Sequence, residues 1–303
     1  MKHLISLLTA LTTAVMLLPM NVSADTAVSG FTYEVTDTSS KTACITGGDN
    51  ISGSVVIPQE IDGYKVTSIG DRAFFGNCDI TSVTVPDGIT EIGSFAFSGC
   101  LSLTDVKLSK YTEKLGNSCF LSCTALVEAD LGESLTAVPE RCFYACTSLR
   151  WADIPETAAL IGSEAYFSCP DTSGIRIPPS VKTIGTDAIG SHYNIRSKSV
   201  ETIPGFSVSG MTDTYAQFYA EDKGFAFTED HGHITGDADL DGLVLAFDAS
   251  SVLREYTLLS SGKRSTFSHL QKQNADFDDD GLITAFDASG ILRAYTMASS
   301  EVG

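Results

Sequence analysis

The chain has 303 residues, of which 43% are hydrophobic, and a formal net charge of -19 at pH 7. This hydrophobic content excludes a disordered protein and is enough for one large domain and a smaller one. The negative charge repels nucleic acid phosphates and anionic lipids, so we expect neither nucleic acid binding nor membrane insertion. It is compatible with a protein that binds calcium.

Residues 1–24 have the pattern of a secretory signal peptide. Lys2 precedes an apolar stretch from Leu4 to Met20, and Val22-Ser23-Ala24 matches the small residues after which signal peptidases cut. The alternative is a single membrane anchor, but the apolar stretch is short for one. We therefore expect a secreted, extracellular protein whose mature chain begins near Asp25.

A 23-residue period follows, from about residue 55 to residue 200. One glycine position recurs at that interval, and an aromatic or apolar residue follows it four positions later. The first column is Gly70, Gly93, Gly116, Pro139, Gly162 and Gly185, and the second is Phe74, Phe97, Phe120, Phe143, Tyr166 and Ile189. Short alternating pieces such as Val83-Thr84-Val85 recur in the same steps and predict strands with two inward residues and one outward residue. Periods of this length predict a solenoid, in which each coil packs only against its neighbours.

The cysteines follow the same period. Cys100, Cys123, Cys146 and Cys169 lie 23 residues apart, and so do Cys119 and Cys142. One structural position that recurs in each coil predicts a column of small buried thiols beside an aromatic column. Disulfides between neighbouring coils are the alternative, because exported chains commonly contain them.

The repeat motif IGxxAFxxCxxLxxVxIP resembles the BspA-like (Treponema-type) leucine-rich repeats over about residues 31 to 227. The resemblance implies a solenoid of about six coils with an N-terminal cap, and a C-terminal cap of one helix and one strand near 210–227. The domain is expected to span 25–227. Pro139 occupies a position where the family has glycine, and Cys119 and Cys142 occupy positions where it has alanine, so we expect irregular middle coils.

Outward strand positions of the middle coils form a candidate binding surface. Trp151, the only tryptophan, is expected beside Glu128, Asp130 and Asp153. An aromatic plane bordered by carboxylates suits a sugar ring or a protein partner. The alternative is an isolated exposed aromatic residue with no binding role.

Two acidic loops lie 39 residues apart near the C-terminus, after an expected linker at 228–235. Each has the spacing of an EF-hand loop, in which alternate oxygen atoms bind a hard cation and a glycine allows the sharp turn. We therefore expect two calcium ions. The expected ligands are Asp237, Asp239, Asp241, the Leu243 carbonyl and Asp248 in the first loop, and Asp276, Asp278, Asp280, the Leu282 carbonyl and Asp287 in the second. Helices are expected after both loops, but no convincing helix is expected before either one.

Two loop–helix units with aspartate at loop position 12 resemble the type I dockerin of bacterial cellulosomes, over about residues 234 to 298. The resemblance implies a small all-α dockerin with two F-hand or EF-hand-like loop–helix motifs, placed at 236–303, that binds a cohesin domain of a scaffold protein. The residues that it implies as contacts are identical in the two copies. They are Ala246, Phe247, Leu253 and Arg254 in the first, and Ala285, Phe286, Leu292 and Arg293 in the second. Alternatively, both phenylalanines pack inside the module and the arginines face solvent.

No motif of a known nucleophile or metallohydrolase occurs in the sequence, so we expect a non-catalytic protein. The expected function is that of a secreted cellulosome subunit. Its dockerin binds a scaffold, and its repeats hold a protein or carbohydrate in polysaccharide breakdown. A dockerin-borne polysaccharide hydrolase, a surface adhesin and a protease inhibitor remain alternatives, because fold alone does not fix function.

Overall fold

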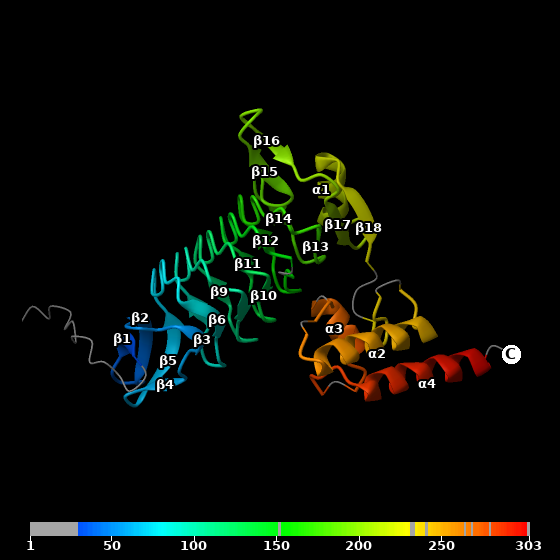
Figure 1. Cartoon of the computed structure of the whole chain (residues 1–303), viewed down its shortest axis with the longest axis horizontal. Helices are drawn as coiled ribbons and strands as arrows, with labels where there is room; N and C mark the ends of the chain where they lie inside the picture. Colours follow the sequence, from blue (N-terminus) through cyan, green and yellow to red (C-terminus); the bar gives the residue numbers. More distant parts are fainter. Residues whose placement is uncertain are drawn as a thin grey trace, which may run out of the picture.

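The computed structural model describes residues 30–150, 153–230, 234–239, 242–263, 265–267, 269–278 and 280–301. In these residues a long stack of short strands and turns is followed by a group of helices (Figure 1). None of the helices in these ranges is long and apolar enough to cross a membrane. The expected signal peptide lies outside the described residues.

The first two sheets of the stack are called here the back sheet and the front sheet. The back sheet contains β1 (Phe31–Asp37), β2 (Thr42–Gly48), β4 (Glu60–Ile61), β5 (Tyr64–Ile69), β7 (Glu91–Ile92) and β9 (Lys114–Leu115). The front sheet contains β3 (Gly53–Val56), β6 (Ile80–Thr84), β8 (Asp105–Lys107) and β10 (Glu128–Asp130). The back sheet runs in the order β1-β2-β5-β7-β9, with β4 beside β5, and the front sheet runs in the order β10-β8-β6-β3.

The coils stack in the predicted 23-residue register. In the front sheet, Ser82 pairs with Asp105, and Asp105 pairs with Glu128, in parallel strands. Between the two sheets, the rings of the aromatic column from Phe74 to Tyr166 stack with centroids 5.2 to 5.6 Å apart. This geometry confirms the predicted aromatic column, which forms the centre of a single continuous core.

The cysteine column lies next to the aromatic column and is buried. Each thiol donates a hydrogen bond to a phenylalanine carbonyl 26 residues earlier, at Sγ to O distances of 3.1 to 3.2 Å. All eight cysteines of the chain are free thiols. The four donors are Cys100, Cys123, Cys146 and Cys169. Thiol to carbonyl hydrogen bonds therefore link consecutive coils in the place where the disulfide alternative has covalent bonds.

The glycine column is required by the close approach of neighbouring coils. A Cβ atom at Gly116 would lie 2.2 Å from the backbone nitrogen of Ser94 in the preceding coil, and one at Gly162 would lie 2.4 Å from that of Glu140. Two residues after each position of this column, the backbone is left-handed, with φ between 50° and 58°. The left-handed residues are Arg72, Phe95, Ser118, Arg141, Glu164 and Asp187.

The back sheet stops at Pro139. This agrees with the irregular middle coils that were expected from a proline at a glycine position. The amide of Gly116 donates to the carbonyl of Ile92, and that of Gly162 donates to Val138, at 2.7 and 2.8 Å. Proline has no amide hydrogen, so it cannot make the equivalent bond. The next strands, β11 (Ala137–Val138), β12 (Leu160–Ile161) and β14 (Thr183–Ile184), form a separate sheet.

Beyond β10, only part of the next expected front strand lies within the described residues. The alternating piece at 152–154 was expected to be a strand, but Asp153 and Ile154 belong to no strand. Trp151 lies outside the described residues. Strands resume at β13 (Gly174–Arg176), which pairs with β17 (Ser207–Gly210), and β17 pairs with β18 (Ala226–Glu229).

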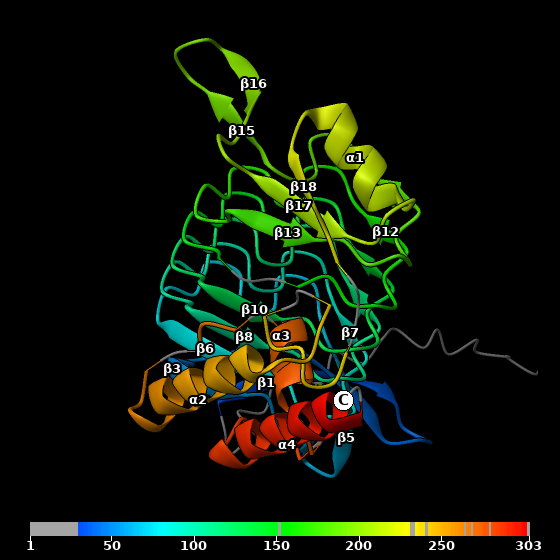
Figure 2. The ribbon, with the colours of Figure 1, turned by 90° about the vertical axis from the view of Figure 1, so that its right-hand side faces the viewer.

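The C-terminal cap has the predicted helix and strand, together with a hairpin that was not predicted. Helix α1 (Tyr215–Lys223) packs on β17, and β18 continues to Glu229, two residues past the expected end of the repeat domain at 227. Strands β15 (Ser191–Asn194) and β16 (Ser199–Thr202) form an antiparallel hairpin that projects from the last coil (Figure 2).

The helices of the C-terminal part form a small module with a core of its own. Helix α2 (Ala246–Ser260) packs against α4 (Ala285–Glu301), through Ala249 and Val252 on α2 and Ala288 and Ile291 on α4. The expectation that no helix precedes either loop is wrong for the second loop, because α3 (His269–Ala275) ends directly before Asp276. In the segment before α3, Thr266 donates hydrogen bonds from its amide and hydroxyl to the carboxylate of Glu255 on α2, at 2.9 and 2.6 Å. These bonds attach the segment to α2.

Candidate metal centre and docking surfaces

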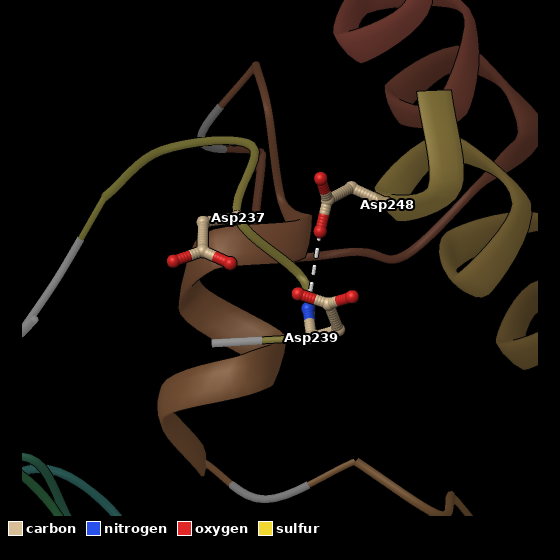
Figure 3. Close-up of side chains that lie close together, drawn as sticks. All are labelled: Asp237, Asp239 and Asp248. Atoms are coloured by element: carbon tan, nitrogen blue, oxygen red, sulfur yellow. Dashed lines mark hydrogen bonds between the residues drawn. The ribbon is translucent and has the colours of Figure 1, made fainter. Parts of the chain in front are cut away.

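Three carboxylates of the first acidic loop converge (Figure 3). One carboxylate oxygen from each of Asp237, Asp239 and Asp248 lies within 4.8 Å of the others, and Asp237 and Asp248 are buried. Gly236, directly before this loop, and Gly242, inside it, have positive φ values of 96° and 85°. The predicted ligand Asp241 lies outside the described residues. Convergent oxygen donors of this kind suit a hard divalent cation such as calcium.

The second loop brings Asp276, Asp278 and Asp280 together within the same 4.8 Å. Loss of hydration raises the pKa of the Asp278 carboxyl, and the negative charges of Asp280 and Asp287 raise it further. A cation between these groups would reverse that effect, because it stabilises the ionised form of each carboxylate. The observed donor sets therefore fit calcium in both loops.

The last aspartate of each loop closes the loop through backbone hydrogen bonds. Asp248 accepts from the amides of Ala238 and Leu245, at 2.9 and 2.7 Å. Asp287 accepts from the amides of Phe277 and Thr284, both at 2.8 Å. These are the same two bonds moved by 39 residues, so the duplication extends to the hydrogen bonds. Asp248 belongs to its carboxylate cluster, whereas Asp287 does not belong to the cluster of the second loop.

The other predicted loop ligands also occupy matching places. Asp237 accepts from the amide of Gly242 at 2.9 Å, and Asp276 accepts from that of Gly281 at 2.7 Å. Leu243 and Leu282 have exposed side chains, 57% and 62% accessible. The side chains of this position therefore lie outside the module core, and only their carbonyls are candidates for a cation.

The two predicted contact sets lie on the surface of α2 and α4. Phe247 and Phe286 are 67% and 76% exposed, and Leu253 and Leu292 are 47% and 46% exposed. Arg254, Arg293 and Ala285 are exposed, and Ala246 is half-buried. The alternative in which both phenylalanines pack inside the module is therefore wrong, and the module presents two matching apolar surfaces.

The candidate surface of the repeat region faces the helical module. Asp130 and Asp153 line a cleft of about 910 Å³ between the front sheet and the module, and Glu128 lines it as well. Glu128 Oε1 lies 2.8 Å from Lys272 Nζ on α3. The predicted surface is thus partly covered by the chain itself. Sequence reasoning missed Lys272; its only signal is that it is the one lysine or arginine in the segment HLQKQNA.

Arg176 is a second residue of this region that the sequence did not single out for its pairing. Its guanidinium is hydrogen bonded to Glu156 at 2.5 Å and to the buried Asp230, and only 13% of its side chain is exposed. Asp230 lies in the segment that was expected to be a linker, 228–235. The repeat region therefore extends to this ion pair.

Comparisons with known proteins bear on the repeat region. Residues 67–196 match the family model "BspA type Leucine rich repeat region" in six copies. The chain is similar in structure to a leucine-rich repeat protein of T. pallidum, with 21% identity and a TM-score of 0.55 over 67% of this chain and 98% of that chain. A leucine rich cell surface protein of Faecalibacterium prausnitzii A2-165 is 23% identical, with a TM-score of 0.44 over 59% of this chain and 60% of that one. No curated protein matches the chain. Residues 67–196 are therefore a BspA-type leucine-rich repeat region within a longer solenoid.

Proposed function

We propose that this protein is a secreted, non-catalytic subunit of a complex that degrades polysaccharides. The C-terminal module is a dockerin that binds a cohesin domain of a scaffold protein once two calcium ions are bound. The repeat region is the interaction module, which holds a protein or a polysaccharide partner. The module thus attaches the repeat region to the scaffold.

The observation that carries this proposal is the duplication of the apolar surface on α2 and α4. Two phenylalanines and two leucines are 46% to 76% exposed at positions 39 residues apart, each beside an exposed arginine. Apolar anchors next to arginine are typical of the centres of protein interfaces. Because the two helices pack against each other through equivalent residues, one partner surface can bind either copy.

Calcium would act in this module as the element that holds each loop in shape. In the first loop it would be held by Asp237, Asp239, Asp241, the Leu243 carbonyl and Asp248. In the second it would be held by Asp276, Asp278, Asp280 and the Leu282 carbonyl, with Asp287 closing the loop. Each loop leads directly into a helix that carries one contact set, so loop order and the position of Phe247 or Phe286 are coupled.

A binding role also agrees with the chemistry of the repeat region. The thiols of the cysteine column donate hydrogen bonds within the core, and their burial raises their pKa values, which makes them poor nucleophiles. The carboxylates of the cleft include Glu128, which is paired with Lys272. We infer that the front sheet binds rather than catalyses.

The test is a pull-down of the full-length protein with immobilised cohesin domains, in calcium and then in EDTA. We expect binding in calcium and loss of binding in EDTA, and native mass spectrometry should count two calcium ions in the bound form. A variant with both Asp239→Ala and Asp278→Ala should bind neither calcium ion tightly. Binding that survives EDTA, or an absence of binding to every cohesin class in calcium, would exclude the dockerin role.

A further inference from the structure

Among the described residues, an ion pair between residues 144 positions apart joins the front sheet and the helical module. Lys272 Nζ on α3 lies 2.8 Å from Glu128 Oε1 on β10. The two side chains are 33% and 29% exposed, so solvent screens the pair less than it screens a pair on the open surface. Figures 1 and 2 both place α3 as the part of the module that faces the front sheet.

A cleft of about 910 Å³ lies around this ion pair. On the side of the repeats it is lined by the outward residues of β6, β8 and β10, including Lys107 and Asp130. On the side of the module it is lined by residues of α3 and of the segments before and after it, including Phe267, Gln273 and Leu282. The front sheet therefore has a facing wall that belongs to the same chain.

The charges of the two parts give Lys272 a clear role in this arrangement. From residue 236 to the end of the chain there are eleven carboxylate side chains and five cationic ones. On the side of the repeats, the carboxylates that line the cleft, such as Asp105, Asp130 and Asp153, outnumber the cations Lys107 and Arg176. Two acidic bodies repel each other unless cations lie between them. Among the described residues of the module, Lys272 is a cation that pairs with the front sheet, and it supplies attraction from the side of the module.

Hydrogen bonds to the first acidic loop fix α3, the helix that carries Lys272, within the module. Asn274 is fully buried, and its Nδ2 donates to the carbonyl of Asp237 at 2.8 Å. The amide of Gly236 donates to the carbonyl of Asn274 at 2.7 Å, and Gln271 Nε2 donates to that of Ala238 at 3.1 Å. A displacement of α3 from the front sheet therefore moves the whole module.

We propose that the front sheet is a docking surface for the helical module of the same chain, and that the Lys272–Glu128 pair holds the two together. In this closed arrangement the module covers Glu128, and a partner of the front sheet has to displace α3 or fit into the cleft. The exposed phenylalanines Phe247 and Phe286 do not line the cleft. The closed form consequently leaves the surfaces proposed for scaffold binding open, while it restricts access to the repeats.

The test uses the full-length protein with calcium present. A carbodiimide, which joins a lysine to a carboxylate only at direct contact, should give a cross-linked peptide that contains Lys272 and Glu128, identified by mass spectrometry. Small-angle X-ray scattering should then show a larger radius of gyration for Lys272→Glu, because charge reversal shifts the ratio of closed to open molecules toward the open form on the order of tenfold.

Two variants separate this pairing from a general effect of charge or folding. Lys263→Glu makes the same change of charge at an exposed site of the module outside the cleft, and should leave the scattering profile unchanged. The exchanged pair Lys272→Glu with Glu128→Lys should restore both the compact profile and the cross-link. The proposal is overturned if the wild-type protein gives no such cross-link, or if Lys272→Glu and Lys263→Glu have the same profile as the wild type.

Discussion

The duplicated surface of the helical module makes a quantitative prediction about scaffold binding. If one cohesin surface binds either α2 or α4, then Phe247→Ala removes only one of two equivalent binding modes. The remaining mode has the full affinity, so the dissociation constant rises about twofold, or about 0.4 kcal/mol. Phe286→Ala should have the same small effect, since its surroundings on α4 match those of Phe247 on α2.

The double variant should behave very differently. Phe247 is 67% exposed, which for a side chain of about 200 Å² leaves about 130 Å² for a partner to cover. At about 25 cal/mol per Å² this area is worth roughly 3 kcal/mol, so loss of both phenylalanines should weaken binding about a hundredfold.

Titration calorimetry in calcium would measure all three variants, with Phe75→Ala as control, because Phe75 is 59% exposed on the repeat region. A hundredfold loss from one single variant would refute the two-mode reasoning. If the double variant weakened binding only by the sum of the two small single-variant effects, the phenylalanines would not be anchors.

Two further predictions concern the thiols and the loop aspartates. Burial raises the pKa of Cys100 and Cys169 to about 12, and it raises those of Cys123, Cys142 and Cys146 well above their usual value. The unfolded chain then loses these protons first, so the associated stability is complete below about pH 9 and declines as the pH rises toward 12. Urea unfolding at pH 8 and pH 10.5 would measure this, and an equal midpoint at both pH values would contradict it. Asp248→Ala should lower the free energy of unfolding of the module by about 3 kcal/mol even in EDTA, because it leaves the amides of Ala238, Asp239 and Leu245 without their acceptor. Asp278→Ala should cost little in EDTA, since it removes a repelled carboxylate, and thermal unfolding of both variants would separate loop closure from cation binding.

The solenoid could be predicted in detail because every coil repeats the same evidence. One phenylalanine proves little, but a column from Phe74 to Tyr166 at equal intervals requires one recurring position, and the rings do stack. The cysteine column and the need for glycine follow in the same way. The exposed positions of Phe247 and Phe286 could not be decided from sequence, because an apolar residue at the start of a short helix suits a core and an interface equally well.

Structural features that occur only once in the described chain could not be predicted from the sequence. Helix α3 has only seven residues, too few for a periodic pattern, and its stability comes from contacts with the first loop. The hairpin of β15 and β16 interrupts the coil pattern after Gly185 and has no counterpart in the preceding coils that the structure describes. The Lys272–Glu128 contact joins segments 144 residues apart, and no local pattern reports such a pairing.

The end of the back sheet at Pro139 marks a junction at which we expect the solenoid to open locally. The back sheet stops at the junction between the coil of Gly116 and the coil of Pro139, where stacked rings, the bond from Cys146 to Phe120 and backbone hydrogen bonds such as that from Phe120 to Cys142 still connect the coils. In a linear stack, each junction contributes its own free energy, so the weakest one sets where partial opening occurs. Amide hydrogen exchange should therefore report two protected segments that open at different rates. Glu128, the residue that Lys272 contacts, belongs to the last coil before this junction, so the helical module meets the solenoid next to the place where its back sheet ends.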